Sequence, residues 1–283
     1  MYHRVLPSSV YHPIWFYSIV LLVAITLCPV LAYLSKHKEL KKFQLPCILL
    51  GLSVPCITAL LMIFASNNAV LIADFWRRLL LYNISAPYLL FILLLMPCVI
   101  CVATWISLFF GYPTEQFSIT KEMSVMKGSA IFGIVIPLLL APLIEELGWR
   151  GYGVDSLRAY FNLFNTSLLF GFFWAVWHLP AFFIKGYYQN ELWNLGIIYV
   201  INFFVSIFAI AVLMNWVYYK TDQSIPAIVL FHAVLNFSSM ILRTQQFTKC
   251  IATGILCIIS GIVIACDSDY FFNNTFLPIQ AGS

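Results

Sequence analysis

Long apolar segments separated by short polar connectors run through the whole chain. Eight of these segments are long enough to cross a hydrocarbon layer about 30 Å thick, which takes roughly 20 helical residues. They predict helices at 14–34, 45–66, 86–110, 128–147, 166–184, 195–219, 224–242 and 250–266. The pattern therefore predicts an all-α, polytopic integral membrane protein, with residues 1–283 forming one membrane domain.

The composition supports this interpretation. Hydrophobic residues make up 62% of the chain and charged residues only 9%, with a mean hydropathy of +0.93, whereas soluble domains are about a quarter charged. The net charge of +4 is small and scattered, so nucleic acid is not expected as a partner. The expected location is a membrane crossed several times, which in a bacterium is the inner membrane. Residues 13–17 lack a small-residue cleavage site, so the first segment is predicted to be a retained helix.

Two adjacent acids, Glu145 and Glu146, stand at the end of the fourth apolar segment. A charge near the bilayer centre costs roughly 2.5–3.5 kcal/mol on insertion scales, so such acids are candidate functional groups. Neighbouring helical residues point about 100° apart, so the two carboxylates face different directions. Glu146 and Arg150 are spaced i,i+4 with the acid first, which favours an ion pair. Glu145 has Trp149 four residues on, and is predicted to face the bundle interior as a general base.

Three further polar residues lie in the later segments: His178 in the fifth, and His232 and Asn236 in the seventh. The seventh segment starts with Ser224 and Pro226, a hydroxyl cap and an early proline typical of a helix start. His232 and Asn236 lie one turn apart on one face. Two such donors aimed at one point would stabilise an oxyanion. Taken singly, each of the three is also explained by an interhelical hydrogen bond.

Two features predict departures from regular helix near these residues. Gly148, Gly151 and Gly153 follow the acid pair and should let the helix bend or unwind. Pro180 withholds a backbone donor two residues after His178, which predicts a kink there.

The polar residues of the three segments resemble the motifs of the CAAX protease and bacteriocin-processing family of intramembrane proteins. Residues 145–150 match the motif EExxxR, and residues 232–236 match HxxxN. Trp174 and His178 match FxxxH, with Trp in the Phe position. The family-like catalytic core covers about 128–245, and residues 1–127 hold the N-terminal spans.

The resemblance implies a glutamate-type endopeptidase that cuts peptide bonds within the membrane without a metal or other cofactor. It implies that Glu145 and His178 bind and activate a water molecule, and that His232 and Asn236 stabilise the tetrahedral oxyanion. Glu146 and Arg150 would support the site. The expected partners are the lipid bilayer and a membrane-associated or hydrophobic peptide or protein. Prenylated proteins and bacteriocin leader peptides are both candidate substrates.

Three alternatives remain open on the sequence. A zinc-dependent protease would use Glu145, His178 and His232 as ligands and leave a fourth position for water, although no HExxH motif occurs. A non-proteolytic immunity or scaffold protein of the same family would use the polar cluster to hold helices together. A proton-coupled transporter would use the acid and histidines as a relay, but the earlier spans carry no acid that mirrors Glu145.

Overall fold

The computed structural model describes residues 6–120, 123 and 130–273, and almost all of this part of the chain is helical. The described residues form no β-strand, and one isolated antiparallel bridge joins Ile119 to Leu242. The all-α prediction is confirmed. The α-helices are α1 (Pro13–Lys36), α2 (Gln44–Phe64), α3 (Ala69–Leu80), α4 (Ala86–Leu108), α6 (Ala130–Gly148), α7 (Val154–Arg158), α8 (Leu163–Trp177), α9 (Tyr188–Leu195), α10 (Ile197–Lys220), α11 (Ile225–Ile241), α12 (Gln246–Cys266) and α13 (Ser268–Phe272).

A helix lies in each of the eight apolar ranges predicted from the sequence. Six helical segments among the described residues are long and apolar enough to cross a membrane: Pro13–Lys36, Lys38–Phe64, Ala86–Leu108, Leu163–Phe183, Ile197–Lys220 and Gln246–Cys266. The other two predicted ranges hold α6, with 19 residues, and α11, with 17. The helix α3 lies in a stretch that the sequence indicated only as a polar connector. The chain is therefore a polytopic membrane protein.

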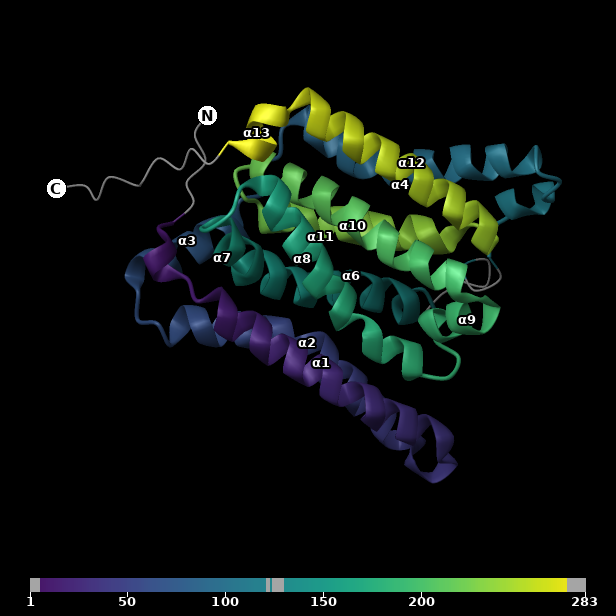
Figure 1. Ribbon diagram of the computed structural model, residues 1–283, viewed down its shortest axis with the longest axis horizontal. Helices are drawn as coiled ribbons and strands as arrows, with labels where there is room; N and C mark the ends of the chain where they lie inside the picture. Colours follow the sequence, from purple (N-terminus) through teal and green to yellow (C-terminus); the bar gives the residue numbers. More distant parts are fainter. Residues whose placement is uncertain (1–5, 121–122, 124–129, 274–283) are drawn as a thin grey trace.

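The helices form layers, with the motif-bearing helices in the middle (Figure 1). The hairpin of α1 and α2 covers one side, and α4 with α12 covers the opposite side. Between them lie α6, α8, α10 and α11, with α6 packed against both α2 and α11, and α8 packed against α10. The candidate site residues on α6, α8 and α11 are thereby brought into the interior of the bundle.

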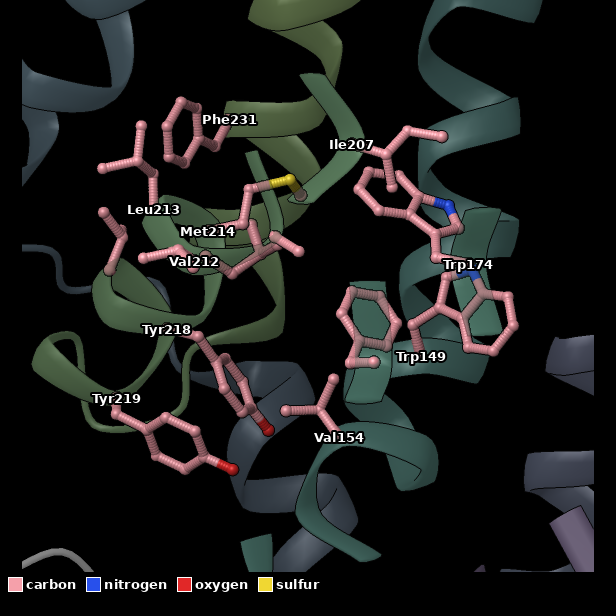
Figure 2. Packing of buried hydrophobic residues seen from close by; sticks show 14 of the residues in the cluster. Trp149, Val154, Trp174, Ile207, Val212, Leu213, Met214, Tyr218, Tyr219 and Phe231 are labelled. Carbon is pink, nitrogen blue, oxygen red and sulfur yellow. The ribbon is translucent and has the colours of Figure 1, made fainter. Parts of the chain in front are cut away.

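Apolar side chains line the outside of the bundle, and polar side chains are enclosed within it. Trp15, Leu22 and Ile258 are exposed, as are many other large apolar residues on the outer helices, which suits contact with lipid. Aromatic and aliphatic side chains fill the interior around Trp149 and Trp174 (Figure 2). The polar groups of the motifs are thus held in an apolar surrounding.

Helix α6 ends in a π-helical turn, η4 (Trp149–Gly153). The glycine cluster predicted a departure from regular helix here, but not its type. π-helical turns are rare and are frequently found at functional sites. At Gly148 the backbone of α2 comes so close that an added Cβ would stand 2.4 Å from the Pro55 carbonyl carbon. The glycine therefore does more than loosen the helix, because it allows α6 and α2 to touch at the start of the π-turn.

Candidate active site

The ion pair predicted from spacing is present at the junction of α6 and η4. Arg150 Nη1 lies 2.6 Å from Glu146 Oε2, and both side chains are completely buried. Arg150 Nη2 donates to Asn215 Oδ1 on α10 at 3.0 Å, and the guanidinium lies over the Phe170 ring. Asn215 in turn donates to Ser167 Oγ at 3.1 Å. Arg150 therefore joins the end of α6 to α8 and α10.

The second oxygen of Glu146 reaches the opposite helix. Glu146 Oε1 lies 2.8 Å from His232 Nδ1 on α11. Because a carboxylate only accepts hydrogen bonds, the Nδ1 of His232 carries a proton. Nε2 is then the ring nitrogen left for other partners. Glu146 thus fixes the orientation of His232, which spacing along the chain alone does not show.

Glu145 faces another way from its neighbour. Its side chain is only 7% exposed, and among the described residues its Oε2 has no hydrogen-bond partner. Glu145 lines a cavity of about 300 Å³ between α1, α2, α6 and the 3-10 helix η5 (Leu179–Phe183), which we call the α2 cavity. The prediction that the two carboxylates diverge is confirmed.

His178 stands at the end of α8. The predicted kink within one helix is replaced by a change of helix type: α8 ends at Trp177, His178 caps it, and η5 follows with Pro180 in its first turn. His178 Nδ1 lies 2.7 Å from the Trp174 carbonyl oxygen. A carbonyl oxygen accepts, so Nδ1 holds the proton and the Nε2 lone pair is free to accept one.

His232 and Asn236 line a second cavity, of about 760 Å³, between α4, α8, α10, α11 and α12. We call it the α11 cavity. Ser224 caps α11 by accepting a hydrogen bond from the Ala227 amide at 3.2 Å, as predicted. The helix start is thereby fixed, and both side chains are presented on one face.

The two cavities meet at His178, which lines both. Glu145 borders only the α2 cavity, and Asn236 borders only the α11 cavity. The Trp174 ring centroid lies 5.6 Å from that of His178 and 5.7 Å from that of His232. Trp174 therefore stands beside both histidines, while Glu145 shares the α2 cavity with His178, and Asn236 shares the α11 cavity with His178 and His232.

Comparison with known proteins decides the family. Residues 127–238 match the Rce1-like family of type II CAAX prenyl endopeptidases. The chain is 36% identical to CAAX prenyl protease 2 of Methanococcus maripaludis over 242 residues, which cover 85% of this chain and 89% of that protein. The chain belongs to the CAAX prenyl protease family. The resemblance seen in its three motifs is confirmed, and the protein is a multi-pass membrane protease.

A buried cation that was not among the predicted site residues supports the π-turn of this CAAX protease. Arg78 on α3 is completely buried, and its Nη1 lies 2.7 Å from Asp155 Oδ2. The same guanidinium donates to the carbonyl oxygens of Arg150 and Gly151. A π-turn leaves carbonyls that the regular helix pattern does not satisfy. Arg78 satisfies two of them, and so fixes the segment that carries Arg150.

The surroundings of Arg78 keep it charged. Tyr218 donates to Asp155 Oδ2 at 2.9 Å, and Tyr219 donates to Oδ1 at 2.7 Å. Burial by itself disfavours the charged guanidinium, but the groups around it, Tyr218 and Asp155 first among them, raise the pKa of Arg78 above its ordinary value. Figure 2 shows both tyrosines reaching down from the apolar cluster with their hydroxyl groups at its edge. The sequence signal for the helix that carries Arg78 is a short amphipathic stretch after Asn68, which caps α3.

The zinc-dependent alternative stays a prediction that an experiment on the protein must test. In the part of the chain that the structure describes, no group of three or more His, Cys, Asp or Glu side chains is arranged to hold a metal ion. His232 directs Nδ1 to Glu146, and His178 directs Nδ1 to a backbone carbonyl. Each histidine thus leaves Nε2 for another partner, an arrangement that suits a bound water and a metal ion equally. Chelation of the purified enzyme distinguishes the two.

Proposed function

We propose that this protease hydrolyses a peptide bond in a prenylated CAAX protein at the meeting point of the two cavities. Its relative from Methanococcus maripaludis is a CAAX prenyl protease, and a CAAX box is a C-terminal sequence whose cysteine carries the prenyl chain. The α2 cavity, with walls that are mainly apolar, suits a lipidated segment. The observation that carries the proposal is that His178 lines both cavities, one shared with Glu145 and the other with His232 and Asn236.

In the proposed reaction, Glu145 and His178 hold the attacking water. Glu145 takes a proton from it as the oxygen adds to the scissile carbonyl, and the free Nε2 of His178 accepts its second hydrogen bond. A carboxylate enclosed in an apolar site suits this task because it is not screened by bulk water. The proton held by Glu145 then passes to the leaving amine as the carbon–nitrogen bond breaks.

The developing negative charge would fall on the opposite side, in the α11 cavity. Asn236 offers an amide donor there, and His232 offers Nε2–H when both of its ring nitrogens carry protons. Glu146, at 2.8 Å from Nδ1, supplies the counter-charge for that form. Donors that are fixed in place before the reaction stabilise an oxyanion without the cost of reorganising.

The proposal is tested with purified protein in lipid nanodiscs and a quenched fluorescent prenylated peptide. We expect Glu145→Gln and His178→Ala each to lower the hydrolysis rate by about 10²–10⁴-fold, with melting temperatures near that of the wild type. Glu191→Gln, which changes an acid on α9 outside the site, serves as the matched control and should retain full activity. Full activity in Glu145→Gln would show that Glu145 is not the base and would end the proposal, whereas no hydrolysis by the wild-type protein would favour the scaffold alternative.

A further inference from the structure

The α11 cavity contains a cation without an acid to balance it. Lys249, in the first turn of α12, lines this cavity together with His232 and Asn236. None of the described residues that line it is Asp or Glu. Lys249 is partly buried, and a charge held away from bulk water without an anionic partner is costly.

The contacts of Lys249 leave its charge largely uncompensated. Its Nζ lies over the Tyr188 ring, 4.3 Å from the centroid. Tyr188 is held in place by a hydrogen bond from its hydroxyl to Gln246 Oε1 at 3.0 Å. No ion pair joins Lys249 to a carboxylate in the described part of the chain. An aromatic face replaces only part of the stabilisation that an ammonium group gains from water or an anion, so the site is suited to an anionic ligand.

Lys249 and the proposed oxyanion donors lie on consecutive helices and line the same cavity. Asn236 is five residues before the end of α11 at Ile241, and α12 begins at Gln246, three residues before Lys249. His232, Asn236 and Lys249 all line the α11 cavity. A peptide that lies along this cavity can therefore contact both the oxyanion donors and Lys249.

We propose that Lys249 binds the free C-terminal carboxylate of the substrate, so that the C-terminal side of the scissile bond occupies the α11 cavity. This inference rests on the proposed function. A CAAX box has three residues after its prenylated cysteine and then ends in a carboxylate, so the end of the substrate chain lies only a few residues from the scissile bond. Lys249 is thus a specificity-determining residue that recognises the end of the chain. The competing role for the same lysine is contact with a lipid phosphate at the membrane surface.

The test measures binding separately from cleavage. Glu145→Gln protein in nanodiscs is titrated with two prenylated CAAX peptides that differ only in ending as a free acid or as an amide. We expect the acid to bind roughly tenfold more tightly. Adding Lys249→Gln should weaken binding of the acid about tenfold and leave binding of the amide unchanged. Lys249→Arg should keep most of the preference.

Lys185→Gln is the matched control. Lys185 is exposed and borders a different cavity, near α9, so removing its charge should leave both affinities unchanged. Equal affinity for acid and amide in protein that retains Lys249 would overturn the proposal, and this comparison needs no further variant to fold. An equal loss with Lys185→Gln, or no saturable binding of either peptide, would overturn it too. Failure of the proposed function shows separately, as hydrolysis by Glu145→Gln protein or none by the wild type.

Discussion

Glu145 and Glu146 are neighbours of the same residue type, yet their surroundings differ completely. Glu146 has both oxygens engaged, one by Arg150 and the other by His232. Glu145 lines the α2 cavity, and one of its oxygens has no hydrogen-bond partner among the described residues. The fully paired carboxylate suits a fixed counter-charge, and the other suits proton transfer. Rotation by about 100° per helical residue is enough to separate the two roles.

Asn236 is expected to act on the transition state more than on substrate binding. We expect Asn236→Ala to lower kcat about 10²–10³-fold, as removal of one oxyanion donor does elsewhere, while KM changes little. Steady-state hydrolysis of the prenylated peptide gives both constants. Glu191→Gln, which changes an acid on α9 outside the site, is again the control and should stay near wild-type activity. A fully active Asn236→Ala protein would remove the oxyanion role.

For individual residues, the sequence was enough to predict contacts within one helix but not contacts between helices. The Glu146–Arg150 pair and the Ser224 cap follow from spacing along the chain, and the structure has both. The contact from Glu146 to His232 depends on how α6 and α11 are placed against each other. No periodicity within either helix contains that information, so Glu146 could be predicted only as a supporting group.

Among the helices, α3 was not predicted from the sequence. Its 12 residues carry apolar and charged side chains on different faces, so it lacks the continuous apolar run by which the spans were found. The same stretch delivers Arg78 to the carbonyls of the π-turn. The glycines predicted that α6 would lose its regular form there, but the partner that stabilises the irregular form lies 72 residues away in the chain.

Removing Arg78 is expected to destabilise this junction strongly. Arg78→Met would leave Asp155 buried without its cation, which costs about 3–5 kcal/mol in the free energy of unfolding. Arg77→Met is a close control, because Arg77 is partly exposed and pairs with Asp74, a contact worth less than about 1 kcal/mol. Thermal melting in detergent compares the two. Equal melting temperatures for both variants would show that Arg78 does not hold the π-turn.

The contact between α6 and α2 is expected to need glycine at 148. Gly148→Ala would place its methyl group against the α2 backbone at Pro55, which cannot move aside as a flexible side chain would. We expect a loss of about 1–3 kcal/mol in the free energy of unfolding and lower activity, because Glu145 and Glu146 lie just before this point. Gly254→Ala on α12, where nothing lies within 4 Å of the added carbon, should be harmless. Similar stability for both variants would contradict the close-contact account.

Over the whole molecule, apolar side chains fill the interior and also cover much of the outer surface, and this was the most predictable property. Composition and the lengths of the apolar segments predicted a multi-pass helical protein, which the structure and the family both confirm. The partition of the site between two cavities was not predictable, because it depends on how the hairpin of α1 and α2 closes against the motif helices. The sequence resemblance covered the motifs but gave no information on that packing.

Metal dependence is a property of the whole enzyme that can be tested directly. We expect the hydrolysis rate to stay within about twofold after exhaustive dialysis against a strong chelator, because the proposed water is held by Glu145 and His178 without an ion. The rate is measured before dialysis, after it, and after adding zinc. Loss of activity that zinc restores would support the zinc alternative, with Glu145, His178 and His232 as the ligands.

The most direct test is a structure of the protein bound to a prenylated phosphinic peptide, whose tetrahedral phosphorus carries two oxygens in place of the attacking water and the oxyanion. The proposal predicts one oxygen within hydrogen-bond distance of Glu145 and His178, and the other within that distance of His232 and Asn236. An analogue that inhibits hydrolysis while any of these four side chains stays out of reach of both oxygens would contradict it.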